Sequence, residues 1–176
     1  MQILVGSSHG IYLPYLITAK DTYNYMSEQS TPSTQSINAA NAAWAFLGLR
    51  LFLALRWLFA GLDKFGSVGN YSFENYYAKM SGMAGGIAEA SIIPGWAAKL
   101  FALPMGYIML ILSVTILLGV KLRISLIVSL LLYVGLSVGL MAVDEQHGIA
   151  WIGVHIIISV MALKMVTNAK WVVLKD

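Results

Sequence analysis

The hydrophobic positions of this chain gather into four long stretches that follow a polar beginning. The stretches cover residues 42–62, 98–119, 124–143 and 149–167. Each is close to the ~20 residues that an α-helix needs to cross ~30 Å of hydrocarbon. Backbone polar groups find no partner in lipid, so helices are the expected form. The pattern predicts an all-α integral membrane protein, a four-helix transmembrane bundle over residues 42–168 with an amphipathic outer loop.

The segments outside the bundle are polar. Residues 1–41 are interpreted as a polar cytoplasmic N-terminal extension, and residues 169–176 as a cytoplasmic tail. A short apolar piece at 11–17 is interrupted by Pro14, and two interpretations stay open for it, an interfacial segment or a segment docked on the bundle. No basic region followed by an apolar core and a small-residue cleavage site opens the sequence, so we expect no cleaved signal peptide.

The long connection between the first two spans has features of its own. Residues 73–80 are rich in Tyr and Phe and predict a short amphipathic helix at the headgroup level. The glycine-rich residues 81–86 are expected to be flexible. In the second span, Pro104 is expected to kink the helix or to lie in its first turns. Gly135 and Gly139 make a small-xxx-small step in the third span, which we interpret as helix packing.

Composition supports the membrane assignment. The chain is 59% hydrophobic and 11% charged, with a mean hydropathy of +0.75, whereas soluble domains are about 45–50% apolar and about 25% charged. The net charge of +3 is scattered, so no nucleic-acid partner is expected. The absence of cysteine excludes disulfides, thiolate metal sites and iron–sulfur clusters held by this chain.

The loop charges predict the orientation. The short link at residues 119–123 is basic, and Lys164, Lys170 and Lys175 follow the fourth span. The positive-inside rule places both segments in the cytoplasm. An even number of spans then predicts a multi-pass cell-membrane protein with both termini cytoplasmic.

Two arginines interrupt the first span. An arginine at the centre of a span costs at least ~2.5–3.5 kcal/mol on insertion scales, so it usually faces the bundle or a polar cavity. Helical spacing puts Arg56 and Asp63 on one stripe, and Arg50, Trp57 and Lys64 on another. Two interpretations stay open. Either Arg50 snorkels to the inner interface while Arg56 pairs with an acid, or the arginines form an anion or quinone-carbonyl site.

A second candidate cluster opens the fourth span, where His147, Trp151 and His155 recur every four residues and Asp144 lies one turn earlier. Such a cluster suits hydrogen bonding to a quinone or relay of its protons. An interfacial aromatic belt with satisfied histidines is the other interpretation. Haem with two histidine ligands, or a metal held from one helix, does not fit this spacing. A quinone is a possible cofactor, and no haem, metal or iron–sulfur cluster is expected in this chain.

Three segments carry a resemblance to a known family. LRLFLALRWLFAGLDKFG at residues 49–66 resembles the first transmembrane helix of the DoxX/DoxD family, which ends in a Gly-x-x-Lys step, here from Gly61 to Lys64. PMGYIMLILSVTILLGVKLR at residues 104–123 is similar to the family's second helix with its basic turn. DEQHGIAWIG at residues 144–153 resembles the DoxD branch. The match covers about residues 45–168.

The resemblance implies a membrane-embedded subunit of thiosulfate:quinone oxidoreductase, which passes electrons from thiosulfate to the quinone pool. Its partners are then other subunits of the redox complex, lipid and quinone. We expect Arg56 and Lys64 to attract a thiosulfate dianion, and the His147/His155 stripe to serve quinone protonation. Candidate catalytic residues are Arg56, Asp63, Lys64, His147 and His155, and candidate cofactor-binding residues are Arg50, Trp151 and His155.

A second interpretation is a non-catalytic accessory or structural subunit of a larger respiratory or photosynthetic complex. The chain has no cysteine and no redox-cofactor motif, so a partner has to supply part of any sulfur chemistry. A transporter or channel ranks third among the interpretations. Such a protein needs polar groups inside its spans, and only the two arginines and His155 break the apolar spans here. A cavity lined by Arg56 and Asp63 and open to the outside favours catalysis. Burial of both against another subunit favours the structural role.

Overall fold

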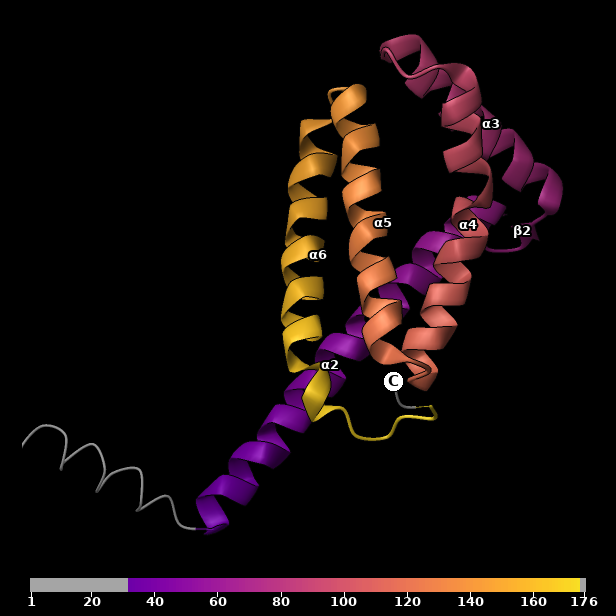
Figure 1. Ribbon diagram of the computed structural model, residues 1–176. Helices are drawn as coiled ribbons and strands as arrows, with labels where there is room; N and C mark the ends of the chain where they lie inside the picture. Colours follow the sequence, from indigo (N-terminus) through magenta and orange to yellow (C-terminus); the bar gives the residue numbers. More distant parts are fainter. Residues whose placement is uncertain (1–31, 175–176) are drawn as a thin grey trace, which may run out of the picture. The chain divides into compact units, whose positions relative to one another are not determined.

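The computed structural model describes residues 32–174, which form an almost entirely helical structure (Figure 1). The long helices are α2 (Pro32–Phe65), α3 (Phe73–Ala90), α4 (Gly95–Leu118), α5 (Leu122–Ala142) and α6 (Gln146–Met165). The apolar segment predicted at residues 11–17 lies outside the described residues.

The remaining elements are short. Strands β1 (Gly66–Ser67) and β2 (Asn70–Tyr71) pair as an antiparallel hairpin between α2 and α3, and the 3-10 helix η1 (Val166–Asn168) follows α6. The chain divides into two compact units, residues 1–38 and 39–176. The description of the first unit begins at residue 32, with the first turns of α2.

Four helices are long and apolar enough to cross a membrane, as the sequence predicts. These stretches are Thr34–Phe65, Gly95–Leu118, Leu122–Ala142 and Gln146–Asn168. The first begins well before the expected residue 42, so part of the predicted N-terminal extension is helical. Proline has a fixed backbone angle that suits the first turn of a helix, and Pro32 begins α2. Residues 33–47 contain neither glycine nor proline, so nothing in them ends the helix.

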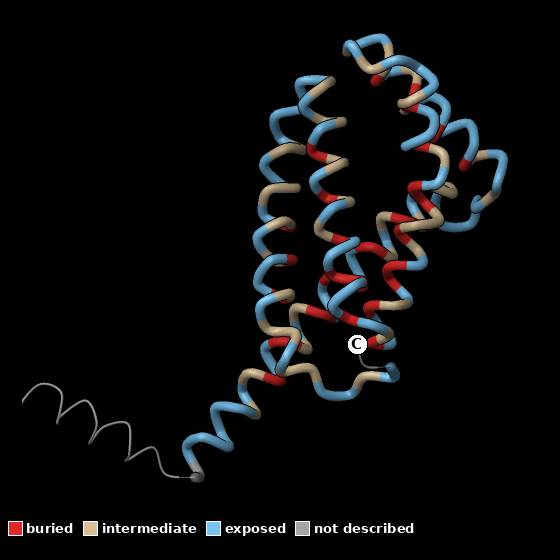
Figure 2. Tube along the Cα trace, viewed as in Figure 1, coloured by how far each residue is buried: buried red, intermediate tan, exposed pale blue. Residues whose placement is uncertain are grey.

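Large apolar side chains lie on the outer faces of the helices as well as in the core, and Figure 2 shows how much of the trace is exposed. Large apolar side chains on the outer faces, such as Ile111, Leu131 and Ile157, are each more than 60% exposed. The buried polar residues of the described chain are instead five serines, Arg50 and His155. Lipid has no hydrogen-bonding groups, so this distribution is the one expected of a multi-pass membrane protein.

The helices pack in two neighbouring pairs, α3 along α4 and α5 along α6 (Figure 1). Side chains of α2 join these pairs. Leu53 and Trp57 of α2 are fully buried in the core with Met105 and Leu126. The Trp57 indole Nε1 also donates to the Ser129 hydroxyl of α5 at 2.7 Å. α2 therefore places Leu53 and Trp57 in the interior of the bundle, whereas Arg56 on the same helix is exposed.

The outer connection is more ordered than the sequence predicts. The short helix expected at residues 73–80 continues through the glycine-rich residues 81–86 as one helix to Ala90, so the expectation of a flexible segment is wrong. Ser72 caps the helix by accepting a hydrogen bond from the Asn75 backbone at 3.0 Å. Buried residues from Tyr76 to Ile87 form a stripe against α4. This packing outweighs the low helix propensity of glycine.

The phenol of Tyr76 forms hydrogen bonds with the backbone of α4 beside Pro104. Pro104 lies inside the helix and cannot donate a backbone hydrogen bond. The Tyr76 hydroxyl donates to the Leu103 carbonyl and accepts from the Gly106 backbone N–H at 3.3 Å. Burial raises the pKa of the Tyr76 phenol, so it keeps its proton at neutral pH. α3 is thus tied to α4 where α4 is weakest.

This contact predicts the effect of Gly106→Ala. A Cβ atom at Gly106 would lie 2.5 Å from Cε2 of Tyr76, closer than atoms can approach. We expect a loss of roughly 1–3 kcal/mol in the free energy of unfolding, the usual cost of overpacking. Thermal unfolding in detergent measures it. Gly153→Ala is the matched control, because no atom lies within 4 Å of that Cβ position; equal melting temperatures for the two variants would contradict the account.

Candidate functional site

One cavity with a volume of about 190 Å³ brings together charged residues of α2 and side chains of three other helices. Arg56, Asp63 and Lys64 of α2 line it, and Tyr133 faces them from α5. The remaining wall is apolar apart from the indole of Trp57, with contributions from α2, α4, α5 and α6. The predicted stripe of Arg56 and Asp63 therefore does line a cavity, and Lys64 joins them.

Arg56 is held by His155. Its Nε donates to His155 Nε2 at 3.2 Å. Since a guanidinium can only donate, that histidine nitrogen accepts, and the proton of the neutral ring lies on Nδ1. Nδ1 is 2.7 Å from the Trp151 carbonyl, to which it then donates. The rings of Phe52 and Tyr133 pack near the imidazole with centroids 5.9 and 5.3 Å away. His155 thus orients Arg56, although it does not itself line the cavity.

Tyr133 supplies a hydroxyl group without a partner. Its side chain is only 3% exposed, and the hydroxyl makes no hydrogen bond to the described residues. The ring is fixed by stacking on Trp57, with centroids 4.2 Å apart. A buried polar group without a hydrogen bond is destabilising by roughly 1–3 kcal/mol. A ligand with an acceptor atom would therefore relieve this cost on entering the cavity.

The cavity carries more positive than negative charge. Asp63 pairs with Lys79 of α3 at 2.9 Å and lies 3.9 Å from Lys64. Among the described residues Arg56 has no acidic partner within salt-bridge distance, so the predicted Arg56–acid pair is wrong. The Lys64 side chain is 22% exposed and the Asp63 side chain 61%. Arg56 is exposed as well, so the cavity is accessible at both Arg56 and Asp63.

Arg50 lies apart from this cavity and has a structural role. It is 4% exposed, so it does not snorkel as expected. Nε donates to the Ile116 carbonyl at 2.8 Å, and Nη2 to the Leu117 carbonyl at 2.5 Å. Nη1 donates to the carbonyls of Trp171 at 3.0 Å and Lys170 at 3.5 Å. Arg50 thus caps α4 and fixes the segment after η1, which leaves its predicted ligand role without support.

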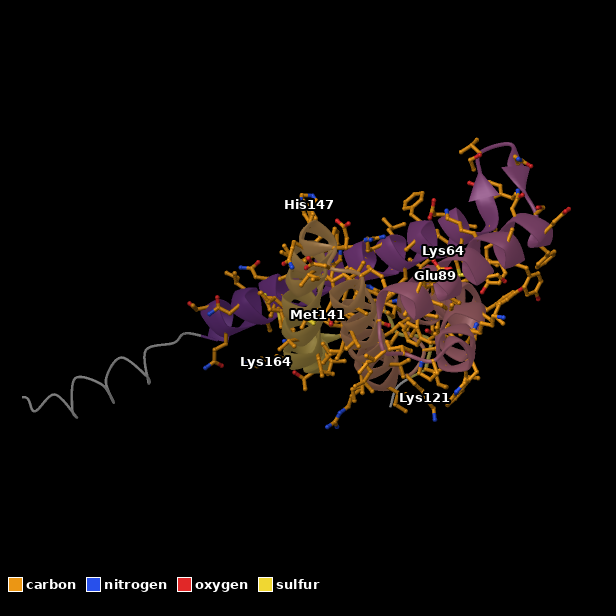
Figure 3. All side chains as sticks on the ribbon, turned by 90° about the horizontal axis from the view of Figure 1, so that it is seen from above. Lys64, Glu89, Lys121, Met141, His147 and Lys164 are labelled. Carbon is orange, nitrogen blue, oxygen red and sulfur yellow. The ribbon has the colours of Figure 1, made fainter. Side chains whose placement is uncertain are left out.

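His147 and Trp151 also lie outside the cavity. The Trp151 indole Nε1 donates to His147 Nε2 at 2.9 Å. An indole N–H only donates, so it cannot pass a proton from one histidine to the other. Figure 3 shows His147 at the start of α6 and Lys64 at the end of α2, at separate places. The arrangement resembles the interfacial pair more than the predicted relay, and only His155 connects this stripe to the cavity.

The sequence analysis did not select Tyr133. The available signal was a tyrosine in the middle of an apolar span, where a hydroxyl needs a partner. Its approach to Trp57 and Arg56 depends on the packing of α5 against α2, which no spacing within one segment indicates.

Comparisons of the chain with protein-family models, with curated proteins and with solved structures give no match. The resemblance to the DoxX/DoxD family therefore rests on the quoted residues alone. The chemistry of the cavity has to be argued from its own side chains.

Proposed function

We propose that the cavity binds the headgroup of a quinone, and that the chain is a DoxD-like membrane subunit of a redox complex that reduces it. One observation carries the proposal: Arg56, Lys64 and Tyr133, which all have hydrogen-bond donors, line with Asp63 one cavity whose other walls are mostly apolar. A quinone has two carbonyl acceptors on an apolar ring. A strongly hydrated dianion such as thiosulfate suits these walls less well, because they do not replace its water.

The same donors suit the reduction chemistry. A quinone takes up two electrons and two protons to become a quinol, and negative charge develops on its oxygens before the protons arrive. Fixed cations and hydrogen-bond donors in a water-poor site stabilise such charge. The chain contains no cysteine, and its sequence has no redox-cofactor motif. The electrons have to come from a partner subunit, where two thiosulfate ions join as tetrathionate and release two electrons.

The polarity of the two ends supports the proposed orientation. The Lys121 backbone N–H donates to the Leu174 carbonyl at 2.9 Å, which places the basic link beside the C-terminal segment. The positive-inside rule assigns this end, with both termini, to the cytoplasm. Arg50 contacts this end, whereas Asp63 lies more than three helical turns further along α2. The proposed quinone site then opens in the outer half of the membrane.

Tyr133→Phe separates a ligand site from simple packing, because the two interpretations predict different results. The hydroxyl has no hydrogen-bond partner among residues 32–174, so its removal should leave thermal stability unchanged or raise it. If the hydroxyl donates to a quinone, the dissociation constant for a short-chain quinone should rise about fivefold to tenfold. Tyr107→Phe is the control tyrosine, since Tyr107 lies outside this cavity. Unchanged affinity in Tyr133→Phe would contradict the proposal.

The complex itself provides the second test. Purification from native membranes in mild detergent, followed by mass spectrometry, should recover a sulfur-handling partner and bound quinone. Thiosulfate-dependent quinone reduction should accompany that preparation. Recovery of oxidase or reaction-centre subunits, without quinone bound to the chain, would instead support the accessory-subunit alternative.

A further inference from the structure

A second hollow lies on the face formed by α3, α4 and α5. Two adjoining depressions of about 270 and 250 Å³ have Ile87, Phe101 and Gly139 in common, so they form one groove. All the residues that line it are apolar or glycine. The groove lies in the apolar part of the bundle, where the neighbouring medium is lipid.

Missing side chains create the groove. A Cβ atom at Gly86 on α3 would meet no atom within 4 Å, and one at Gly139 on α5 would first meet Ile87 Cδ1 at 3.8 Å. By contrast, the space at Gly135 is filled by the Phe101 ring, 3.1 Å from its Cβ position. The small-xxx-small step therefore does not receive a neighbouring helix along its whole length. Gly139 leaves open space beside the backbone.

The groove adjoins the headgroup cavity. Leu136 of α5 lines both. On α4, Met105 lines the groove and Met109, one helical turn away, lines the cavity. Methionine side chains are flexible and adapt to the shape of what they contact. A molecule with a polar head in the cavity and an apolar tail in the groove would therefore contact Leu136, Met105 and Met109.

We propose, resting on the proposed function, that the groove holds the apolar tail of the quinone whose headgroup occupies the Arg56 cavity. Lipid is as apolar as the tail, so leaving it brings no hydrophobic gain, and the interaction comes from close packing against the glycine backbone. The groove gives a membrane-dissolved quinone a lateral way into the cavity, without passage through water. It also makes the site selective for tailed quinones over their bare rings.

The test compares two quinones that share one ring, one with a decyl tail and one with a methyl group in its place. Their dissociation constants are measured with the full-length chain in detergent, for wild type, Gly139→Leu and Gly86→Leu. Leucine in the groove should weaken binding of the tailed quinone about tenfold, the usual scale of overpacking. Binding of the bare ring should stay within about twofold. Gly153→Leu is the control, at a helical glycine with open space outside both sites.

Each result has a distinct meaning. Equal weakening of both quinones, or weakening of neither, in both groove variants overturns the tail groove. In that case the headgroup site still stands if Arg56→Leu abolishes binding of the bare ring. Competition by a long-chain phospholipid, with no preference of wild type for the tailed quinone, overturns the groove proposal in favour of a bound acyl chain. If neither quinone binds wild type, the proposed function itself is overturned.

Discussion

Arg50→Leu is expected to destabilise the chain by at least roughly 1–3 kcal/mol, the cost of leaving buried hydrogen-bond acceptors without their donor. The guanidinium donates to four backbone carbonyls, two at the end of α4 and two in the segment after η1. Arg50 is buried, so water does not readily replace the lost donor at these last carbonyls of the helix. The substitution therefore releases the end of α4 and the C-terminal segment together.

Two further variants define the role of Arg50. Arg50→Lys keeps the charge but not the planar fork of donors, so an intermediate melting temperature is expected. Arg56→Leu is the matched control on the same helix, because Arg56 makes a single hydrogen bond within the described structure. Thermal unfolding in detergent should separate the two leucine variants clearly. A melting temperature of Arg50→Leu close to that of wild type would contradict the capping role.

Arg56→Leu should have the second large effect, on function. We expect it to lower quinone reduction by the intact complex by about 100-fold or more, the scale found when one stabilising donor is removed from a developing anion. Folding should be only slightly affected, since the one lost hydrogen bond is to His155. Turnover with a short-chain quinone, together with assembly of the complex, measures both. Arg50→Leu is the comparison, because that substitution is expected to lower stability while leaving the side chains of the cavity in place.

The intermediate variant is again lysine. Arg56→Lys preserves a cation at the cavity but loses the Nε contact that His155 orients. Partial activity with a raised KM is expected. Full turnover in Arg56→Leu, with the complex assembled, would exclude Arg56 from the reaction.

The sequence predicted the spans well, because long apolar runs have few alternatives to a membrane helix. It placed the start of the first span at residue 42, since the preceding residues are polar, yet helix formation there follows from Pro32 and local propensity. It also missed the continuation of α3. The glycine-rich part of that helix packs against α4 through buried residues such as Ala84 and Ile87, a contact between separate segments that local sequence does not show.

The sequence predicted only part of the candidate site, because spacing along one helix does not show contacts between helices. Helical spacing relates Arg56, Asp63 and Lys64 within one helix, and the structure does bring them to one cavity. Spacing does not show which face meets which neighbour. Arg50 therefore turned out to be a cap, and the hydroxyl of Tyr133 entered the site from another helix.

Photoaffinity labelling with an azido-substituted short-chain quinone tests the central claim most directly. The full-length chain in proteoliposomes is labelled, digested and analysed by mass spectrometry. We predict saturable labelling of the peptides that contain Tyr133 or Ile152, displaced by excess quinone and lost in Arg56→Leu. Labelling that does not saturate, or that persists in Arg56→Leu, would contradict a quinone site in this cavity.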